Sequence, residues 1–304
     1  MRIVIIGGTG FIGKKLVASL HQEEYDLTVV TRNADKAREV LGDHAEICQW
    51  DGENEEVLDR IFSDAYAVIN LSGENVGNKR WTKSQKQKIV ESRVKSAKTI
   101  VRAINRSESR PGVLIQASAI GFYGSDSKNE KTEKSAKGKG FLSDVAQKWE
   151  EATRELDASV RLVLLRTGVV IGPGGGALKA METPFLFKLG GHFGQGKQWL
   201  SWIHIEDAVK AIRFLLENKD AVGVYNLTSP YPEKMKDFAI ELGRALKTRS
   251  WFHVPSFVIR LLMGQMGVEM LLSSQKVLPM RLLEEDYTFQ FTELRSALTG
   301  IYNA

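Results

Sequence analysis

The chain has 304 residues, of which 43% are hydrophobic and 26% are charged, as in an ordinary globular protein with a large core. No apolar run approaches the ~18 residues of a membrane-spanning helix, and the N-terminus lacks the apolar stretch of a secretory signal. The single cysteine, Cys48, excludes an internal disulfide and a cysteine-rich metal site. We expect a buried thiol at a strand end and a cytoplasmic protein.

The formal net charge is +5, which raises the question of a nucleic-acid partner. The basic residues gather in 79–98, a segment typical of a helix, and in 128–139, which indicates a mobile loop. Neither segment interleaves its cations with aromatic residues as a stacking surface for bases does. We therefore expect no nucleic-acid and no membrane partner, and a monomer or homodimer that acts on a small molecule.

Strand and helix signals alternate through the first ~230 residues, which predicts a parallel sheet with helices on both faces. From Phe11 the apolar period changes, because Ile12, Leu16 and Leu20 lie four residues apart on one helical stripe. Further helices are predicted at 82–105, 141–156 and 207–217. The predicted strands are 2–6, 27–31, 46–50, 67–71, 113–117, 161–166 and 224–227.

Two regions depart from this alternation. Residues 172–197 are rich in glycine and include an apolar patch at 184–189 that the pattern indicates to be buried. After Pro232 the pattern becomes helical, with Phe238 and Leu242 on one stripe and a strongly apolar run at 257–263. We expect this tail to pack on the sheet domain.

The strongest motif lies between the first strand and the first helix. Gly7 permits a tight turn, Gly10 lets the backbone approach a pyrophosphate, and Gly13 lets helix and strand pack closely. The N–H groups at the start of the helix favour an anion. The motif predicts a dinucleotide site whose turn comprises Gly7, Thr9, Gly10, Phe11, Ile12 and Gly13.

The residues after the second strand indicate which dinucleotide binds. An NAD-specific fold presents Asp or Glu about 20 residues beyond the glycine turn, to hold the ribose hydroxyls. Here the segment reads Thr31-Arg32-Asn33. A guanidinium pairs with a 2′-phosphate in a forked, charge-assisted geometry, whereas a carboxylate would repel it. We therefore expect NADP(H); the alternative is that Arg32 is an ordinary exposed loop residue.

These motifs predict a Rossmann-type, doubly wound parallel α/β sheet with a smaller, mainly helical C-terminal domain. We place the NADP-binding domain at 1–228, with the glycine-rich insertion at 172–197. The C-terminal domain, at 229–304, is expected on the substrate side.

The chain resembles an atypical extended short-chain dehydrogenase/reductase, of the NAD(P)-dependent epimerase family whose members carry a C-terminal domain of unknown function. The resemblance covers nearly the whole chain. The segments that carry it are the glycine turn, 70–75 (NLSGEN), Arg80-Trp81, Ser92-Arg93, 118–124 (SAIGFYG), Trp149-Glu150, Arg166-Thr167-Gly168, 174–176, 194–196, Trp202-Ile203-His204 and 287–291.

The resemblance implies further cofactor contacts. Asp51 would reach the adenine amine, while Leu71, Ser72 and Gly73 would line the phosphate and ribose side of the dinucleotide. Two more residues, Glu74 and Arg80, would lie near it. The alternative for Arg80 is a place in the basic start of the following helix.

Hydride-transfer members of this superfamily use a tyrosine as acid and base, with a lysine four residues later that lowers its pKa. An unassisted tyrosine, with a pKa near ~10, is a poor base at neutral pH. None of the seven tyrosines here has a lysine at the fourth following position. Where the family pattern places the pair, the chain reads 141–148 (FLSDVAQK), and we expect Lys148 to pair with Asp144 at helical spacing.

Two hydroxyls remain as catalytic candidates. Ser118 ends the fifth predicted strand, where we expect it to contact the substrate, and Tyr123 is expected as a substitute proton donor; the alternatives are a capping serine and an aromatic wall. On the substrate side the block Arg166, Trp202 and His204 completes the predicted site. His204 alternatively supports the loop and caps a helix together with Asp207. No residues have metal-ligand spacing.

Two functions follow from this pattern. The first is an NADP(H)-dependent oxidoreductase or epimerase-like enzyme with an altered acid and base, acting on an unknown small polar substrate. The second is a non-enzymatic NADP(H)-responsive binding or regulatory protein. The missing Tyr-x-x-x-Lys couple favours the second function, and the retained Ser118 and the long insertion favour the first.

Overall fold

In the computed structural model, which describes residues 1–302, seven parallel strands form one central sheet in the order β12-β7-β5-β4-β1-β2-β3. All seven coincide with predicted strands to within two residues at either end, so the prediction of a Rossmann-type, doubly wound sheet is confirmed. The strands are β1 (Arg2–Ile6), β2 (Asp26–Thr31), β3 (Glu46–Gln49), β4 (Ala67–Asn70), β5 (Val113–Ala119), β7 (Arg161–Thr167) and β12 (Gly223–Leu227).

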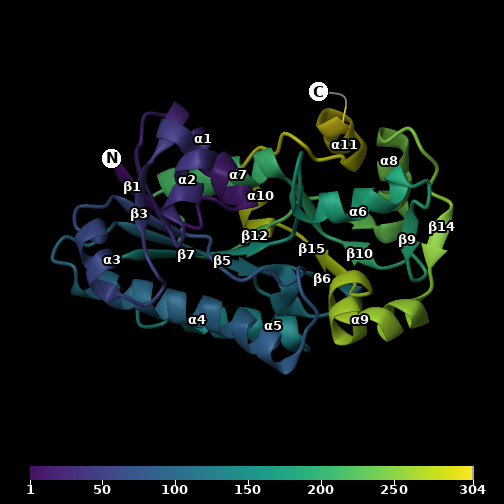
Figure 1. Cartoon of the computed structure of the whole chain (residues 1–304), viewed down its shortest axis with the longest axis horizontal. Coiled ribbons are helices and arrows are strands. Elements are labelled where there is room, and N and C mark those ends of the chain that lie inside the picture. The colour runs from purple at the N-terminus through teal and green to yellow at the C-terminus, as the bar shows by residue number, and fades with distance from the viewer. Residues whose placement is uncertain (303–304) are drawn as a thin grey trace.

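Helices cover both faces of the sheet, as Figure 1 shows. Those below the sheet in that view are α3 (Glu55–Phe62), α4 (Lys83–Arg106) and α5 (Phe141–Glu151); those above it are α1 (Phe11–Gln22), α2 (Ala34–Leu41) and α7 (Ile205–Glu217). No helix within residues 1–302 combines the length and the apolar character needed to cross a membrane.

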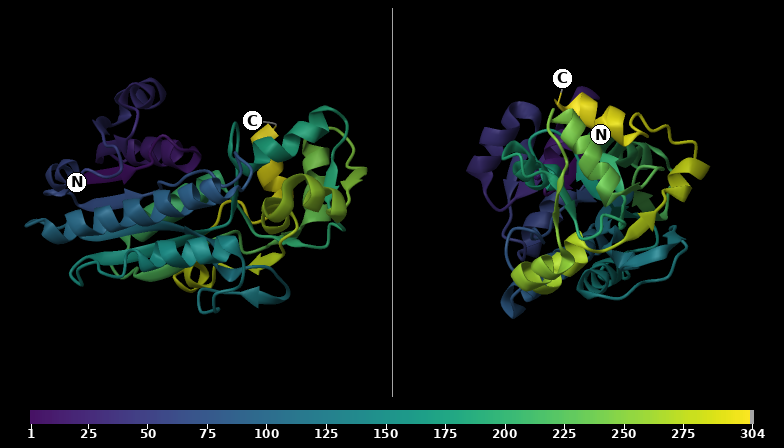
Figure 2. Two further views of the ribbon diagram at one scale, coloured as in Figure 1. Left: turned by 60° about the horizontal axis from the view of Figure 1, so that its bottom comes forward. Right: turned by 90° about the vertical axis from the view of Figure 1, so that its right-hand side faces the viewer.

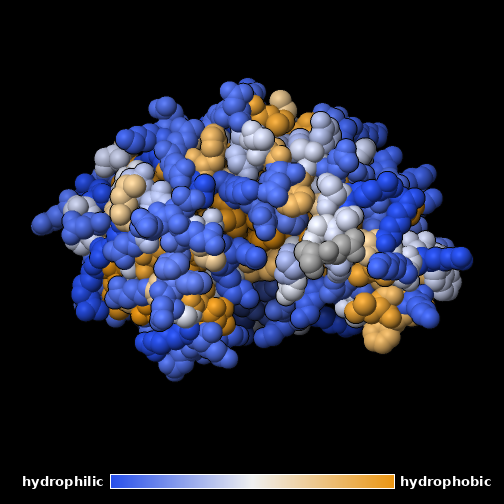
Figure 3. Space-filling model, turned by 90° about the horizontal axis from the view of Figure 1, so that it is seen from above, coloured by the Kyte–Doolittle hydropathy of each residue, from blue (hydrophilic) through white to orange (hydrophobic). Residues whose placement is uncertain are grey.

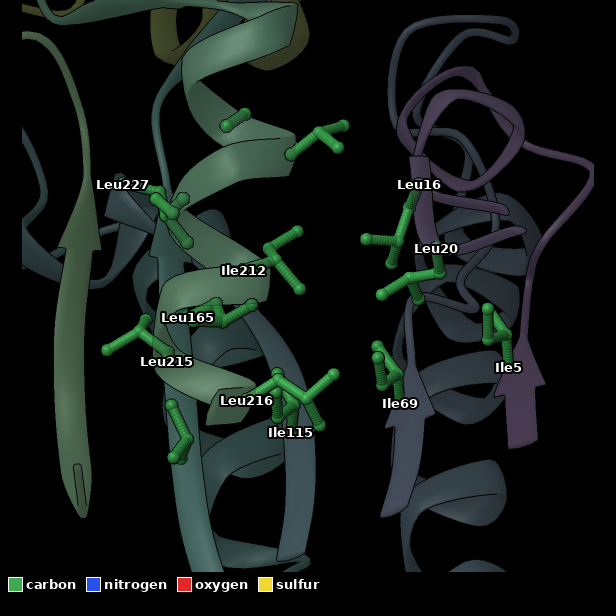
Figure 4. Close-up of a cluster of buried hydrophobic side chains, with 14 of the residues drawn as sticks. Ile5, Leu16, Leu20, Ile69, Ile115, Leu165, Ile212, Leu215, Leu216 and Leu227 are labelled. Carbon is green, nitrogen blue, oxygen red and sulfur yellow. The ribbon is translucent and has the colours of Figure 1, made fainter. Parts of the chain in front are cut away.

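The core above the sheet explains the helical stripe seen in the sequence. Leu16 and Leu20 of α1 point toward Ile5 and Ile69 of the sheet, while Ile212 of α7 fills the neighbouring space (Figure 4). All five side chains are buried. Truncating one of these large side chains to alanine would cost about 2–5 kcal/mol, so this face fixes the position of α1 against β1 and β4.

The C-terminal part lies at the carboxyl edge of the sheet (Figures 1 and 2). Helices α6 (Gly176–Leu186), α8 (Met235–Ala245) and α11 (Leu294–Tyr302) share a second core with Trp202 and Ile171. The predicted boundary at 228 stays a prediction. The remaining elements are β6 (Asp126–Lys131), β8 (Val169–Ile171), α6 (Gly176–Leu186), β9 (Gly191–Phe193), β10 (Trp199–Leu200), β11 (Trp202–His204), β13 (Glu233–Lys234), α8 (Met235–Ala245), β14 (Phe252–Val254), α9 (Ser256–Leu271), β15 (Gln275–Val277), α10 (Met280–Glu284) and α11 (Leu294–Tyr302).

Four expectations about local structure were wrong. The predicted mobile loop 128–139 contains part of β6, which pairs in parallel with β15, and the ion pair between Lys276 and Glu130 joins the two strands. A strand with polar residues on both sides has no apolar alternation to reveal it. The helix predicted at 141–156 ends at Glu151, where the Thr153 hydroxyl donates to the Glu150 carbonyl and a turn follows.

The other two corrections concern burial. Within the 184–189 patch Phe185 is buried, but Leu186 and Phe187 are exposed. The patch belongs to the last turn of α6 and the loop after it, so only one side can face the core. Cys48 is only half-buried and lies inside β3, at the edge of the sheet.

Candidate functional site

A groove of about 640 Å³ runs along the carboxyl ends of β1, β2 and β4. It lies where the strand order reverses between β1 and β4, the place at which doubly wound sheets bind dinucleotides. Helix α4 forms one of its walls. Its lining residues are Ile6, Gly7, Thr9, Gly10, Val30, Thr31, Arg32, Asn33, Lys36, Trp50, Asp51, Gly52, Glu53, Leu71, Ser72, Gly73, Glu74, Lys88, Glu91, Ser92, Lys95 and Ser96.

The glycine turn has the backbone geometry that a pyrophosphate requires. Gly7 has a φ of +86°, which side chains rarely permit, and a Cβ at Gly13 would lie 2.3 Å from the Gly7 carbonyl oxygen. Gly10 precedes α1 without any side-chain cap, and the first turn of α1 has no acidic residue. The N–H groups at the start of α1 are therefore available to an anion.

Two cations stand at the end of β2. Arg32 and Lys36 both line the groove and are exposed, and neither takes part in an ion pair within residues 1–302. Asn33 fixes the turn between them, because its side chain accepts a hydrogen bond of 3.0 Å from the Lys36 N–H and caps α2. Lys36 thus lines the groove together with Arg32; our sequence reasoning missed it, although the Asn-x-x-Lys spacing after the strand was visible.

The loop after β4 is held by polar contacts with α4. The Ser72 hydroxyl donates to the Asn70 side chain at 2.6 Å, and the Glu74 N–H donates to the Ser92 hydroxyl at 3.1 Å. Beneath this loop, the Arg93 guanidinium donates to the Glu74 carbonyl oxygen at 2.9 Å. A Cβ at Gly73 would lie 3.0 Å from that guanidinium, so the loop can approach α4 only because this residue is glycine.

Arg93 is an internal support of the site that our sequence reasoning did not assign. Its guanidinium lies over the Trp149 ring, 4.8 Å from the centroid. Burial lowers the pKa of Arg93 to about 10, so the side chain remains positively charged at neutral pH. The sequence signal that could have indicated this support is the Ser92-Arg93 pair, one of the segments that carry the family resemblance.

Most of the predicted cofactor residues line this groove: Gly7, Thr9, Gly10, Thr31, Arg32, Asp51, Leu71, Ser72, Gly73 and Glu74. The remaining turn residues Phe11, Ile12 and Gly13 begin α1, and the Phe11 ring packs against Gly175 and Gly176. Arg80 is not among the lining residues; it donates to the Leu262 carbonyl oxygen of α9 at 2.6 Å.

A buried polar cluster joins the carboxyl ends of β5 and β7. The Ser118 hydroxyl donates to Glu150 Oε1 at 2.6 Å, and Arg166 binds both Glu150 carboxylate oxygens, at 2.8 and 2.7 Å. Arg166 also donates to the Tyr123 hydroxyl at 3.0 Å, and that hydroxyl donates to the Asn226 side chain at 2.7 Å. The structure thus brings three predicted site residues together, because Glu150 links Ser118 to Arg166 and Arg166 bonds directly to Tyr123.

Neither candidate hydroxyl in this cluster is open to solvent. Ser118 is 4% exposed and Tyr123 is 2% exposed. Burial raises the pKa of Tyr123, although Arg166 opposes the shift. The sequence signal that could have indicated the cluster is Trp149-Glu150, which places a carboxylate just after the segment 141–148 where the family pattern expects the tyrosine and the lysine.

The expected ion pair between Lys148 and Asp144 is not present in the structure. Asp144 instead pairs with Lys137 at 2.6 Å, and Lys148 is exposed. Helical spacing allows an i,i+4 pair but does not require it, and Lys137 reaches Asp144 from the segment that precedes α5.

Two of the predicted substrate residues lie in the core. Trp202 is buried, and its indole N–H donates to the Tyr231 carbonyl oxygen at 3.1 Å. His204 is buried and caps α7, because its Nδ1 accepts from the Glu206 N–H at 3.3 Å. Burial lowers the pKa of His204 to about 4. Asp207 accepts from the Phe291 N–H at 2.8 Å, so this segment supports the C-terminal tail as one of our two interpretations expected.

Comparison with known proteins agrees with this geometry. A sequence model described as the NAD dependent epimerase/dehydratase family matches residues 3–228, three quarters of the chain. The chain belongs to this family. A second model, a domain of unknown function (DUF1731), matches residues 254–301, so the resemblance inferred from the sequence is confirmed.

Relatives within this family align over almost the full chain. Epimerase family protein YfhF of Bacillus subtilis is 36% identical over 99% of this chain and 98% of that protein. The chloroplastic SDR39U1 homolog of Arabidopsis thaliana is 35% identical over 99% of this chain and 86% of that protein. The crystal structure of human epimerase family protein SDR39U1 with NADPH is 34% identical, covers 100% of this chain and 99% of that chain, and has a TM-score of 0.90.

The groove fits the dinucleotide that the family binds. The close approach at Gly7 and Gly13 and the uncapped start of α1 match the pyrophosphate. The cations beyond β2 match the ribose end of the dinucleotide. The chain is therefore an NAD(P)-binding member of the family.

Proposed function

We propose that this protein is an NADP(H)-dependent oxidoreductase or epimerase-like enzyme that acts on a small polar substrate without a Tyr-x-x-x-Lys couple. The observation that carries the choice of NADP(H) is the exposed pair Arg32 and Lys36 in the lining of the groove. A 2′-phosphate there would bind through charge-assisted hydrogen bonds. The NADPH in the crystal structure of the human relative supports this choice.

When bound, the dinucleotide supplies or accepts the hydride at the substrate carbon. The protein must then move one proton at the substrate oxygen, and we assign this role to Ser118. In the oxidation direction, the Ser118 oxygen takes the substrate proton while its own proton passes to Glu150, 2.6 Å away. In the reduction direction both protons return. Arg166 fixes both carboxylate oxygens of Glu150 for this exchange.

The remaining candidates take supporting roles in this proposal. Tyr123 is the second proton donor to test, and its hydroxyl is oriented by Arg166 and Asn226. Lys148 has no role, because it is exposed on α5. The step requires a substrate oxygen to reach Ser118, which is buried here. The carboxyl end of β5 must therefore open when the ligands bind.

The test is the oxidation of NADPH in the presence of a panel of carbonyl compounds, followed by absorbance. Once a turnover is found, we expect Ser118→Ala to lower the rate about 10²–10³-fold, the usual cost of losing a donor to a developing oxyanion. Lys148→Ala, a control at an exposed residue of α5, should leave the rate unchanged. Circular dichroism should show that both variants are folded.

Two outcomes would contradict the proposal. If Lys148→Ala alone abolished turnover in a folded protein, a lysine-assisted relay would operate. If no carbonyl compound were reduced, or if neither Ser118→Ala nor Tyr123→Phe changed a turnover that had been found, the non-enzymatic NADP(H)-responsive function would replace the enzymatic one.

A further inference from the structure

Large apolar side chains are exposed at the end of the molecule that lies farthest from the N-terminus. This end, at the right in Figure 1, carries the loop after α6, the strand β14 and the first half of α9. A group of hydrophobic side chains also shows at the right of the space-filling view in Figure 3. We define the apolar end by its exposed residues Leu186, Phe187, Trp251, Phe252, Phe257 and Leu261.

The degree of exposure is unusual for residues of this type. Leu261 is 80% exposed, Phe187 is 73% exposed and Phe257 is 69% exposed. Single apolar residues on a surface need no explanation, but several that adjoin one another mark a site of interaction.

Hydrogen bonds hold the loop after α6 against the segment at the start of β14. The N–H groups of Trp251 and Phe252 both donate to the Gly190 carbonyl oxygen at 3.1 Å, and the Trp251 indole donates to the Lys188 carbonyl oxygen at 2.9 Å. The parallel pairing of β14 with β9 continues this contact. Pro255 directly follows the last paired residue of β14, Val254, and precedes the first residue of α9.

Within α9 the exposed residues lie on one side of the first two turns. Phe257 and Leu261 are four residues apart and therefore neighbours on the helix surface, and the exposed Arg260 lies beside them. Ile259 is buried and attaches the helix to the protein. At Gly264, with a φ of +57°, the helix is interrupted. The first half is thus a short helix with one attached side and one open side.

The charged side chains of the two segments that carry the apolar end have a single sign. The sequence has no Asp or Glu at 183–205 or at 242–268, whereas Lys188, Lys247, Arg249 and Arg260 lie in these segments. None of the four takes part in an ion pair within residues 1–302. The carboxylates that bound these segments are held elsewhere: Glu182 bonds to the Tyr302 hydroxyl, and Glu241 pairs with Arg244 and Arg295.

We propose that the apolar end binds the surface of a lipid bilayer that contains anionic lipids. Aromatic and leucine side chains would enter the boundary between headgroups and acyl chains, to a depth of about 5–10 Å, while the cations contact the lipid phosphates. Trp251 suits this boundary because its ring is apolar and its N–H is polar.

A second copy of the chain fits this surface less well. In a two-fold symmetric dimer each patch meets its own equivalent. The cations of one patch would then face the cations of the other patch, with no carboxylate from these segments between them. These cations are Lys188, Arg249 and Arg260. An anionic bilayer removes this repulsion and also accepts the apolar side chains.

The proposed surface leaves the dinucleotide groove free, because none of its six residues lines the groove. The protein can therefore bind its cofactor while it rests on a membrane. This inference departs from the sequence expectation of no membrane partner; within residues 1–302 the structure has no helix able to span a membrane, and a surface contact does not need one. It does not depend on the proposed catalytic function.

The test is co-sedimentation of the full chain with two kinds of vesicle. One consists of phosphatidylcholine alone, and the other of phosphatidylcholine and phosphatidylglycerol in a two-to-one ratio. We expect binding to the second kind only, weakened by added salt because the cations are exposed.

Two pairs of matched variants examine the two parts of the surface. Leu261→Ser should lower the partition coefficient about tenfold or more, because a leucine no longer enters the bilayer. Val222→Ser, a similar change at an exposed valine elsewhere, should have no effect. Lys188→Gln should lower it about fivefold and Lys219→Gln should not, since each cation near an anionic surface contributes about 1 kcal/mol. An unchanged affinity for NADPH would show that the variants are folded.

Three results would overturn the proposal. The first is no binding to either kind of vesicle, and the second is equal binding to both. The third is a dimer in analytical ultracentrifugation that Leu261→Ser dissociates, because the apolar end would then be an interface between two copies.

Discussion

Replacing Arg32 is the sharpest test of which cofactor this protein uses. We predict that NADPH binds at least tenfold more tightly than NADH, and that Arg32→Ala removes most of this difference. Arg32 lines the groove at the end of β2 and has no ion-pair partner within residues 1–302, so its guanidinium is available to a 2′-phosphate. NADH lacks that phosphate and should bind the variant as it binds the original protein.

The expected magnitude follows from the surroundings of Arg32. A hydrogen bond to a charged group is worth about 1.5–3 kcal/mol, and each 1.4 kcal/mol is a factor of ten. Because the side chain is exposed, the lower part of that range applies, which gives a loss of about tenfold to thirtyfold for NADPH alone. Lys36 remains in the variant and retains part of the preference. Arg32→Asp should reverse the preference, because a carboxylate repels the phosphate and can accept from the ribose hydroxyls.

Isothermal titration calorimetry with each dinucleotide measures these affinities directly. Arg38→Ala is the matched control, because Arg38 is an exposed arginine of α2 that does not line the groove. Raising the ionic strength should narrow the difference between NADPH and NADH, since exposed charges are screened. Equal affinities in the original protein, or an equal loss for both dinucleotides in Arg32→Ala, would refute the reasoning.

Three further predictions concern other parts of the structure. Gly10→Val should abolish dinucleotide binding in a folded protein, because its Cβ would lie 3.2 Å from the Gly7 carbonyl oxygen and fill the place of the pyrophosphate; an unchanged dissociation constant would count against the groove. Glu150→Ala should lower the free energy of unfolding by about 3–5 kcal/mol, since it leaves Arg166 buried without its partner, whereas Glu151→Ala on the exposed side of α5 should change it little. Burial lowers the pKa of His204 to about 4, so between pH 6.5 and 4 the unfolded chain binds a proton that the folded chain does not, and stability falls as the pH falls. The melting temperature should depend less on pH in His204→Asn, which keeps a capping side chain, than in the original protein. An equal dependence on pH in the two proteins would disprove the assignment.

The sheet and the glycine turn could be predicted from the sequence because their signals are local. Buried parallel strands are short apolar runs, and the turn between β1 and α1 needs glycines at fixed spacing. Leu16 and Leu20 revealed α1 for the same reason. By contrast α2 and α3 have eight residues each, too few for a stripe to stand out.

The polar cluster could not be predicted, because its members come from four separate elements. Ser118, Glu150, Arg166 and Asn226 meet only when α5 packs on the paired strands β5 and β7. A sequence shows that each residue is polar but not which partners it finds. The mistaken pairing of Lys148 with Asp144 had the same origin, since the actual partner Lys137 lies outside the helix.

The C-terminal helix α9 gives the two proposals a common structural basis. Its second half contacts the start of α5, whose N-cap residue offers no capping side chain. The Glu269 carboxylate accepts from the Phe141 and Leu142 N–H groups at 3.0 and 2.9 Å and so caps α5. Its first half, beyond Gly264, carries Phe257 and Leu261 to the surface. Through this cap the second half of α9 contacts the start of α5, the helix whose Glu150 accepts from the Ser118 hydroxyl. The interruption at Gly264 thus divides α9 between two surfaces, because the residues before it are open to solvent and the residues after it cap α5.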